Sequence, residues 1–336
     1  MKTVFLIGNG FDINLGLKTS YNYFYNYYIN LPRDKNHSLV QELKSYITEY
    51  IKGKNNNWSD LEIGIGNHTT KLNNFEDVEI VYDDINESIQ NYVTEIDEAF
   101  NEKIEEFDFN LLKTNILKFN SFLTPEESTF VRSNAKSTSD THTIDIISFN
   151  YTTIIEKTIK IGNEPLEIGR AFYNSNVKSI LNNIIHIHGN VDDPILGVND
   201  KTQIANENLR EDIRVQNYLI KPLMNQSLRH LNDNKTKEII NNSHLICLYG
   251  LSLGETDKTW WELIGKRVLD GVMLILFVYD KDTKRIPARK NEIRRRDWQD
   301  KFMNIANIPK ESFEKVRNRI MITFNSPIFD IRKETI

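Results

Sequence analysis

The chain has 336 residues, enough for one large domain or for two lobes around a shared core, and too many for a small disulfide-stapled scaffold. Hydrophobic residues make up 39% and charged residues 26%, a balance that excludes a largely disordered chain. The formal net charge of -5 gives no general attraction to nucleic acid or anionic lipid, so binding to either would need a local basic patch.

The number of cysteines and the first residues of the chain indicate the cellular compartment of the protein. The only cysteine, Cys247, lies in the apolar run HLICLYG, so an internal disulfide and a multi-cysteine zinc cluster are excluded and a buried thiol is expected. The start MKTVFLIGNGFD has too short an apolar run for a signal-peptide core, and no run has the length of a membrane span. We therefore expect a cytoplasmic protein that does not engage a membrane.

Apolar runs along the chain predict the strands of a parallel sheet. They are TVFLIGNG from Thr3, DIISFNY from Asp145, NNIIHIHG from Asn182, HLICLYGLSL from His244 and MLILFVYD from Met273. Most of them end in glycine or in a polar residue within a turn-like stretch, as strands do where their carboxyl ends face a ligand. These endings mark the predicted site.

Helical periodicity dominates the region after the first run. The segments SLVQELKSYITEYI and VEIVYDDINESIQNYVTEIDEAFNEKIEEF carry apolar residues three or four apart, and SNAKSTSDTHT predicts the loop that returns the chain to the sheet at Ile144. The segment between His188 and His244 predicts loops and at least one helix. We therefore expect one α/β domain spanning 1–336, built from about 1–21 and 141–336, with a mostly helical insertion over 22–140.

The basic run KRIPARKNEIRRRDWQDK, residues 284–301, leaves three interpretations open. It fits a solvated helix, a contact between subunits, or a local patch for nucleic acid, and the first two explain it at least as well as the third. Nucleic acid is therefore not the expected partner.

The first strand ends in a glycine turn that suits a phosphate, because a strand ending in Gly-Asn-Gly and turning into a helix brings backbone N–H groups to a helix start. Gly8 and Gly10 fit the first two glycines of the fingerprint G-x-G-x-x-G. Its third position is Ile13, and no strand-ending acid follows about twenty residues later, so an ordinary dehydrogenase is disfavoured.

The whole stretch GNGFDINLGLKTSY resembles the sirtuin pattern G-A-G-I-S-x-x-S-G-I-P-x-F-R, with Gly8, Gly10 and Gly16 on its three glycines. It resembles more closely the AbiH family of bacterial abortive-infection proteins, together with WSDLE from Trp58, FNYT, and HIHGN followed by ILGVND. The resemblance implies a sirtuin-like, Rossmann-type doubly wound parallel sheet with an inserted helical lobe, and a role in anti-phage defence.

The same resemblance implies an NAD glycohydrolase, which cleaves NAD to nicotinamide and ADP-ribose without a metal. Asn150 would orient the ribose or the attacking water, and His188 would act as acid and base. The residues that it places around NAD are Gly8, Asn9, Gly10, Phe11, Asp12, Tyr21, Gly250, Ser252 and Asp280. Cleavage of an abundant cofactor needs gating, so a phage-derived trigger and a homo-oligomer are expected.

Several of these residues have a purely structural interpretation. Asn150 fits a turn residue that caps local backbone, and His186 and His188 alternate on one strand, as packed core histidines or two metal ligands would. Asp12 fits the N-cap of the first helix or a contact near the nicotinamide ribose. Glu62 fits either a group that reaches the site or an exposed helical acid.

Departures from the sirtuin pattern open two rival functions. The zinc cysteines are absent, Asp12 and Lys18 replace its Ser and Pro, and Thr152 stands where an Asp would follow the catalytic Asn. A deacylase is therefore disfavoured, and water is the simpler acceptor. Thr152 also motivates a catalytically silent nucleotide-binding sensor or interaction module. A metal-dependent nuclease would draw on the carboxylates Asp12, Glu62, Asp192 and Asp193, whose spacing matches no known motif.

Overall fold

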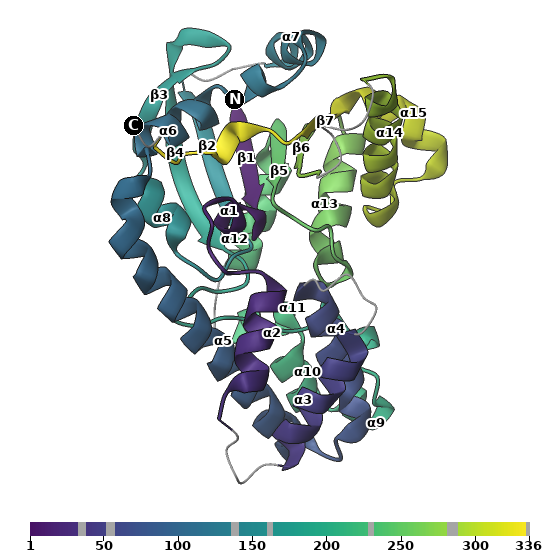
Figure 1. Ribbon diagram of the computed structural model, residues 1–336. Helices are drawn as coiled ribbons and strands as arrows, with labels where there is room; N and C mark the ends of the chain where they lie inside the picture. Colours follow the sequence, from purple (N-terminus) through teal and green to yellow (C-terminus); the bar gives the residue numbers. More distant parts are fainter. Residues whose placement is uncertain are drawn as a thin grey trace.

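The computed structural model describes residues 1–32, 38–51, 58–135, 141–159, 164–227, 232–280 and 288–333. The chain has a mixed α/β fold around a seven-stranded sheet with the order β3-β4-β2-β1-β5-β6-β7 (Figure 1). The strands are β1 (Lys2–Ile7), β2 (Thr141–Ser148), β3 (Leu166–Ala171), β4 (Asn174–His186), β5 (Leu245–Tyr249), β6 (Met273–Val278) and β7 (Ile320–Phe324). Neighbouring strands are parallel, except that β3 pairs antiparallel with β4.

The sheet is covered by helices on both faces, which is why its inner strands are almost continuously apolar. Along β1, Phe5 and Ile7 pack into a core under α6, α7 and α8, whereas Val4 and Leu6 pack into a second core under α12, α13 and α14. The five predicted strand runs are confirmed as β1, β2, β4, β5 and β6. The strands β3 and β7 were not predicted.

The chain reverses its direction across the sheet at β1. From β1 it adds β2 and β4 on one side, and later β5, β6 and β7 on the other. Because these strands are parallel, their carboxyl ends share one edge, and the loops after β1 and β5 leave it side by side. Such a reversal point is where open α/β sheets form a ligand crevice.

Fifteen α-helices occur among the described residues. They are α1 (Gly10–Asn14), α2 (Tyr21–Asn30), α3 (Ser38–Ile51), α4 (Trp58–His68), α5 (Phe75–Lys103), α6 (Phe109–Leu117), α7 (Pro125–Asn134), α8 (Ile154–Ile159), α9 (Glu207–Glu211), α10 (Ile213–Leu219), α11 (Lys221–Ser227), α12 (Asn232–Asn242), α13 (Lys258–Leu269), α14 (Ala288–Ile305) and α15 (Phe313–Val316). The helices predicted from periodicity correspond to α3 and α5.

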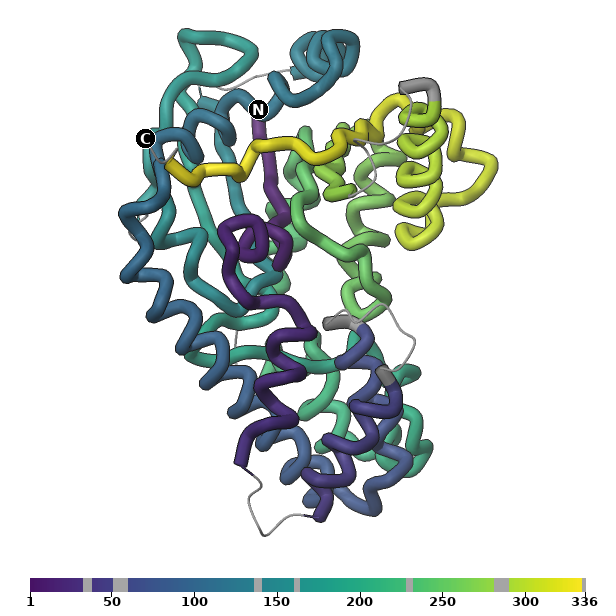
Figure 2. The backbone as a smooth tube through the Cα atoms, viewed as in Figure 1, coloured from purple at the N-terminus to yellow at the C-terminus, as the bar shows by residue number. Residues whose placement is uncertain are grey.

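A helical lobe lies beyond the carboxyl edge of the sheet and consists of α2, α3, α4, much of α5, and α9 to α11. Its core joins residues between Tyr21 and Val93 with residues between Ile195 and Met224. Figure 2 shows these two chain segments side by side at the lower end of the molecule. The lobe therefore includes chain from outside 22–140, while α6 and α7 from within that range pack on the sheet. The proposed domain division stays a prediction.

Two other predicted segments are described only in part. Residues 136–140 of the return loop lie outside the described residues, and β2 begins at Thr141, three positions before Ile144. Of the basic run, 288–301 lies in α14, where Arg294 pairs with Asp280 and Arg295 Nη1 lies 2.8 Å from Glu127 Oε1. Two of its cations are thus neutralised within the chain.

Candidate functional site

The loops after β1 and β2 meet through a buried carboxylate. Asp12 is 1% exposed, and its Oδ1 accepts a hydrogen bond from Asn150 Nδ2 at 3.1 Å. Its Oδ2 accepts another from Thr152 Oγ1 at 2.7 Å. Asn9, and not Asp12, is the N-cap of α1, so the interpretation of Asp12 as a helix cap is wrong.

This contact fixes the orientation of the Asn150 amide. An ionised carboxylate can only accept hydrogen bonds, so the amide presents Nδ2 to Asp12 and turns Oδ1 the other way. Asn150 Oδ1 is buried and has no hydrogen-bond partner among the described residues. A buried acceptor without a partner is costly, and it is a place where a bound molecule or water would donate.

Burial raises the pKa of the Asp12 carboxyl to about 7, against the opposing effect of the hydrogen bonds from Thr152 and Asn150. The group therefore changes its charge near neutral pH, within contact of Asn150. A carboxyl group with this property in a protein interior is a candidate functional group.

His186 holds the backbone of the same loop. Its Nδ1 lies 2.8 Å from the Asn150 carbonyl oxygen and its Nε2 lies 2.6 Å from Glu156 Oε1. Burial disfavours the charged imidazolium, but the hydrogen bond and the charge of Glu156 outweigh burial and raise the pKa of His186. Both ring nitrogens are engaged, so His186 supports the loop and does not form a metal pair with His188.

His188 lies at the junction of the sheet and the helical lobe. The side chain is 9% exposed, and its ring packs edge-on against Phe149 with centroids 5.2 Å apart. Its Nε2 lies 3.0 Å from Asp257 Oδ1, an ion-pair distance, although the N–H is not in line for a hydrogen bond. Asp257 in turn contacts Lys221 Nζ at 3.0 Å.

Glu62 reaches this junction from the lobe. The side chain is 5% exposed, and both carboxylate oxygens lie 3.1 Å from Lys221 Nζ. The interpretation of Glu62 as an exposed helical acid is therefore wrong. The motif WSDLE forms the start of α4 and delivers this acid to the interior.

The two glycine loops touch each other through their backbones. Gly8 N donates to Tyr249 O at 2.8 Å and Gly10 N donates to Gly250 O at 2.9 Å. A Cβ added at Gly10 would lie 2.4 Å from the Gly250 Cα, so only glycine permits the approach. Because these two N–H groups already have acceptors, a phosphate at this edge would have to use other donors.

The remaining predicted binding residues are dispersed. Asn9 clamps its own loop, with Nδ2 donating to Thr19 O at 2.9 Å. Phe11 is a core residue packed on Phe329 with ring centroids 5.5 Å apart, and Tyr21 is buried in the core of the helical lobe. These three side chains thus take part in the glycine loop, the core of the sheet and the core of the helical lobe, respectively.

The loop after β5 contacts the glycine loop of β1, whereas Asp280 after β6 is paired elsewhere. Ser252 follows Gly250 in the loop that meets Gly10, and Leu253 beside it has a left-handed backbone with a φ of 54°. Asp280 lies at the end of β6, where its backbone N–H donates to Asn325 Oδ1 at 2.7 Å and its side chain pairs with Arg294. No contact among the described residues joins Asp280 to Asn150 or His188.

The carboxylates of the nuclease alternative are not gathered at one point. Asp12 is engaged by Asn150 and Thr152, and Glu62 by Lys221. Within the described parts of the chain, no three His, Cys, Asp or Glu side chains are grouped so that they would hold a metal ion.

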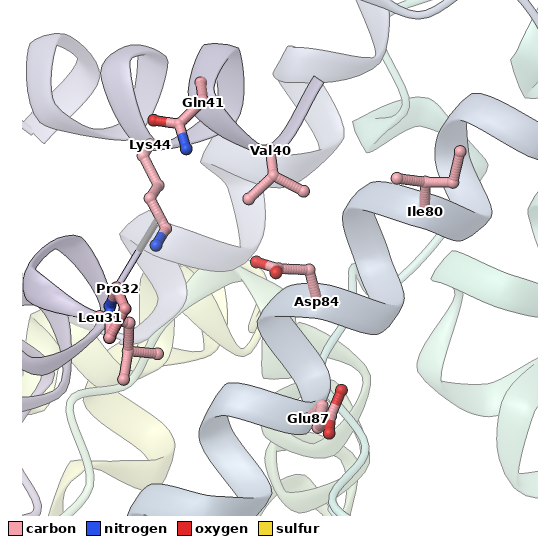
Figure 3. A pocket seen from close by; sticks show the side chains of 8 residues that line it. All are labelled: Leu31, Pro32, Val40, Gln41, Lys44, Ile80, Asp84 and Glu87. Atoms are coloured by element: carbon pink, nitrogen blue, oxygen red, sulfur yellow. The ribbon is translucent and has the colours of Figure 1, made fainter. Parts of the chain in front are cut away.

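Two surface cavities lie away from these residues. One of about 280 Å³ opens in the helical lobe between the end of α2, α3 and α5, and Figure 3 shows its lining side chains, among them Lys44 and Asp84. Another of about 450 Å³ lies beside α6 and the end of β3, and Arg132 and Arg170 line it. Neither is lined by a predicted site residue.

Comparison with protein families decides the kinship of the chain. The family model described as bacteriophage abortive infection AbiH matches residues 4–280. The chain belongs to the AbiH family. The matched range runs from β1 to the end of β6 and so includes every predicted site residue.

The match confirms the resemblance to the AbiH family, and membership in that family suggests anti-phage abortive infection. A comparison with curated proteins finds no match. In the described part of the chain, every helix is too short or too polar to cross a bilayer.

Two residues of the site were not predicted. Lys221 stands in the run YLIKPL, where a lone lysine among apolar residues is a signal for a buried, paired ammonium. Asp257 stands in the segment GETDK, which also contains Glu255, and the sequence does not show which of these two acids is buried.

Proposed function

We propose that this AbiH chain is an NAD glycohydrolase of anti-phage defence, which hydrolyses NAD to nicotinamide and ADP-ribose. The observation that carries the proposal is the buried, partnerless Oδ1 of Asn150, whose amide is oriented by Asp12 at the reversal point of the sheet. A buried acceptor in such a crevice suits a ribose hydroxyl or a water molecule.

The order of the strands supports a dinucleotide as the ligand. Counted along the chain without the antiparallel β3, the parallel strands lie in the order 3-2-1-4-5-6, which is that of dinucleotide-binding sheets. The proposal therefore includes the finer, sirtuin-like assignment of the fold. In this proposal Gly250 and Ser252 bind the phosphates of NAD, and the amides of Gly8 and Gly10 do not serve as the donors.

The chemistry assigned to the site is a substitution at C1′ of the ribose. The bond from C1′ to the nicotinamide nitrogen breaks, and its electron pair leaves with nicotinamide as the positive charge moves to the ribose. Water then adds to C1′ and gives up a proton. Asn150 Oδ1 would hold the ribose hydroxyl or the water, and His188 would accept the proton, a role typically contributing about 10²-fold or more in rate.

The contact between Asp12 and Thr152 favours an enzyme over a silent sensor. The sirtuin pattern has a hydroxyl residue at the position of Asp12 and an acid at the position of Thr152. In this chain the acid and the hydroxyl are exchanged, and they contact each other at 2.7 Å beside the Asn150 amide. Asp12 therefore supplies, next to Asn150, the carboxyl group that position 152 lacks.

Nicotinamide release from NAD by the purified chain, with and without extract of phage-infected cells, tests the proposal. We expect Asn150→Ala and His188→Ala each to reduce release by about 10²-fold or more. Asn304→Ala and His244→Ala are matched controls, since Asn304 is an exposed residue of α14 and His244 lies at the opposite edge of the sheet.

The same assay separates the rival functions. Binding of ADP-ribose without nicotinamide release in either condition would support the sensor. Loss of both binding and release would reject a nucleotide site altogether. A phage-derived trigger is part of the proposal, because the infected extract is expected to raise turnover in the wild-type chain.

A further inference from the structure

A buried row of charges connects the helical lobe to His188. It runs from Glu62 in α4 to Lys221 at the start of α11, and from there to Asp257, which precedes α13. Asp257 ends the row 3.0 Å from His188 Nε2. The four side chains come from four different segments of the chain, so the row exists only while the lobe is docked on the carboxyl edge of the sheet.

The row is deeply buried. Glu62 and Lys221 are each 4% exposed, and the Asp257 side chain is 17% exposed. Burial would neutralise the Lys221 ammonium, but Asp257 and Glu62 outweigh burial and keep its pKa raised. Burial also favours the uncharged form of the Asp257 carboxyl, but Lys221 and His188 outweigh burial and keep the pKa of Asp257 below its ordinary value. Lys221 and Asp257 are therefore charged together.

Stability alone does not account for such a row. Taking ions out of water costs about as much as their attraction returns, and apolar side chains of similar size usually stabilise an interior at least as well. Asp257 also stands at the N-cap of α13, yet its side chain makes no capping hydrogen bond. A favourable helix contact is thus left unmade while the carboxylate faces Lys221 and His188.

The charge balance of the row concerns His188 directly. Glu62 and Asp257 are two negative charges and Lys221 is one positive charge, which leaves one negative charge uncompensated at the end where the imidazole lies. Asp233 adds another carboxyl group whose electrostatic partners include His188 and Lys221. These negative charges lie on the side of the imidazole ring where Nε2 faces Asp257 Oδ1 at 3.0 Å.

We propose that Asp257, Lys221 and Glu62 are positioning residues that fix His188 for its proton transfer and make this fixation depend on the docked helical lobe. The inference rests on the function proposed above, because it assigns roles toward the same reaction. It also explains why WSDLE, a motif far from the strand ends in the chain, belongs with the site.

Asp257→Asn tests the positioning role with the least disturbance. It removes the carboxylate beside His188 but keeps Glu62 and Lys221 as a balanced pair. We expect kcat for nicotinamide release to fall by at least about tenfold while the Kd for ADP-ribose changes less than about twofold. A folded Asp257→Asn chain with wild-type kcat would overturn the proposal.

Substitutions at the other end of the row test whether the lobe takes part. Lys221→Arg, which keeps the charge, should retain more turnover than Lys221→Met, and Glu62→Gln should lower kcat. Tyr28→Phe is the matched control, because it removes a hydrogen bond to Asp84 within the lobe that lies outside the row. Equal turnover in Lys221→Arg and Lys221→Met would contradict the proposal.

A measurement without NAD keeps this inference distinct from the proposed function. The ring C–H resonances of His188, assigned by their loss in His188→Gln, should shift in Asp257→Asn and in Glu62→Gln at constant pH, and not in Tyr28→Phe. If the wild type releases no nicotinamide but these shifts occur, the row is upheld and the NAD reaction fails. If no variant shifts the resonances, the row does not act on His188.

Discussion

At the scale of single residues, the interpretation of Asp12 from the sequence differs most from its position in the structure. Its position near the start of a helix predicted a cap or a ribose contact, and the residue instead accepts hydrogen bonds from Asn150 and Thr152 within the interior. The sequence identified Asn150 and His188 by their positions after strands. It could not identify their partners, because Asp12 and Asn150 are separated by 138 positions and only the sheet brings them together.

Asp12 should make the stability of the protein depend on pH. Its ordinary pKa is 3.8, and burial raises it to about 7 in the folded chain. Between these values the folded protein keeps a proton that the unfolded chain loses. The free energy of unfolding therefore falls as pH rises from about 4 to about 7, by up to about 4 kcal/mol from this one group.

Asp12→Asn should remove this contribution, since asparagine resembles the protonated carboxyl group and does not titrate. Urea unfolding should show the variant close to the wild type near pH 4 and more stable than the wild type at pH 8. A stability difference that is the same at both pH values would show that Asp12 does not ionise as inferred.

At the scale of elements, the strands were predictable where their sequence is continuously apolar. Every residue of β6 is buried, and its run MLILFV was recognised. The edge strand β3 was missed because half-exposed residues interrupt its pattern, and it contains a glycine and an arginine. The strand β7 was not predicted although its run IMITF is apolar, because no glycine turn or motif follows it.

The contact between the glycine loops gives a prediction for these elements. Gly10→Ala places a Cβ 2.4 Å from the Gly250 Cα, and neither backbone can move without breaking the hydrogen bond from Gly10 N to Gly250 O. We expect a loss of about 1–3 kcal/mol in the free energy of unfolding, or somewhat more.

Gly64→Ala is the matched control for this substitution. It lies within α4, and its Cβ would meet only the side chain of Tyr50, at 3.1 Å. Alanine is favoured over glycine in a helix by about 1 kcal/mol. This gain offsets the cost of the close contact with Tyr50, so the net change in the free energy of unfolding should be small. Equal losses in both variants, measured by denaturant unfolding, would show that the loop contact is not tight.

At the scale of the whole molecule, the helical lobe and the sheet are connected by buried charge as well as by apolar packing. The sequence predicted an inserted helical region, but not that α9 to α11 would complete its core or that Lys221 would pair with Glu62. These are contacts between distant parts of the chain, and no local pattern encodes them.

The charged connection predicts strong non-additivity between substitutions. Lys221→Met leaves the carboxylates of Glu62 and Asp257 buried without a cation and should cost about 3–5 kcal/mol of stability. Adding Glu62→Gln removes one of the two stranded charges, so the double variant should be more stable than Lys221→Met alone. Denaturant unfolding measures both, and simple addition of the single losses would contradict the account.

The central claim is that the carboxyl edge of the sheet cleaves NAD. The most direct measurement is nicotinamide release from NAD by the wild-type chain and by Asn150→Ala, side by side, in the presence of extract from phage-infected cells. The account predicts release by the wild type and a loss of about 10²-fold or more in the variant. Absence of release from the wild type, or equal release from both proteins, would contradict it.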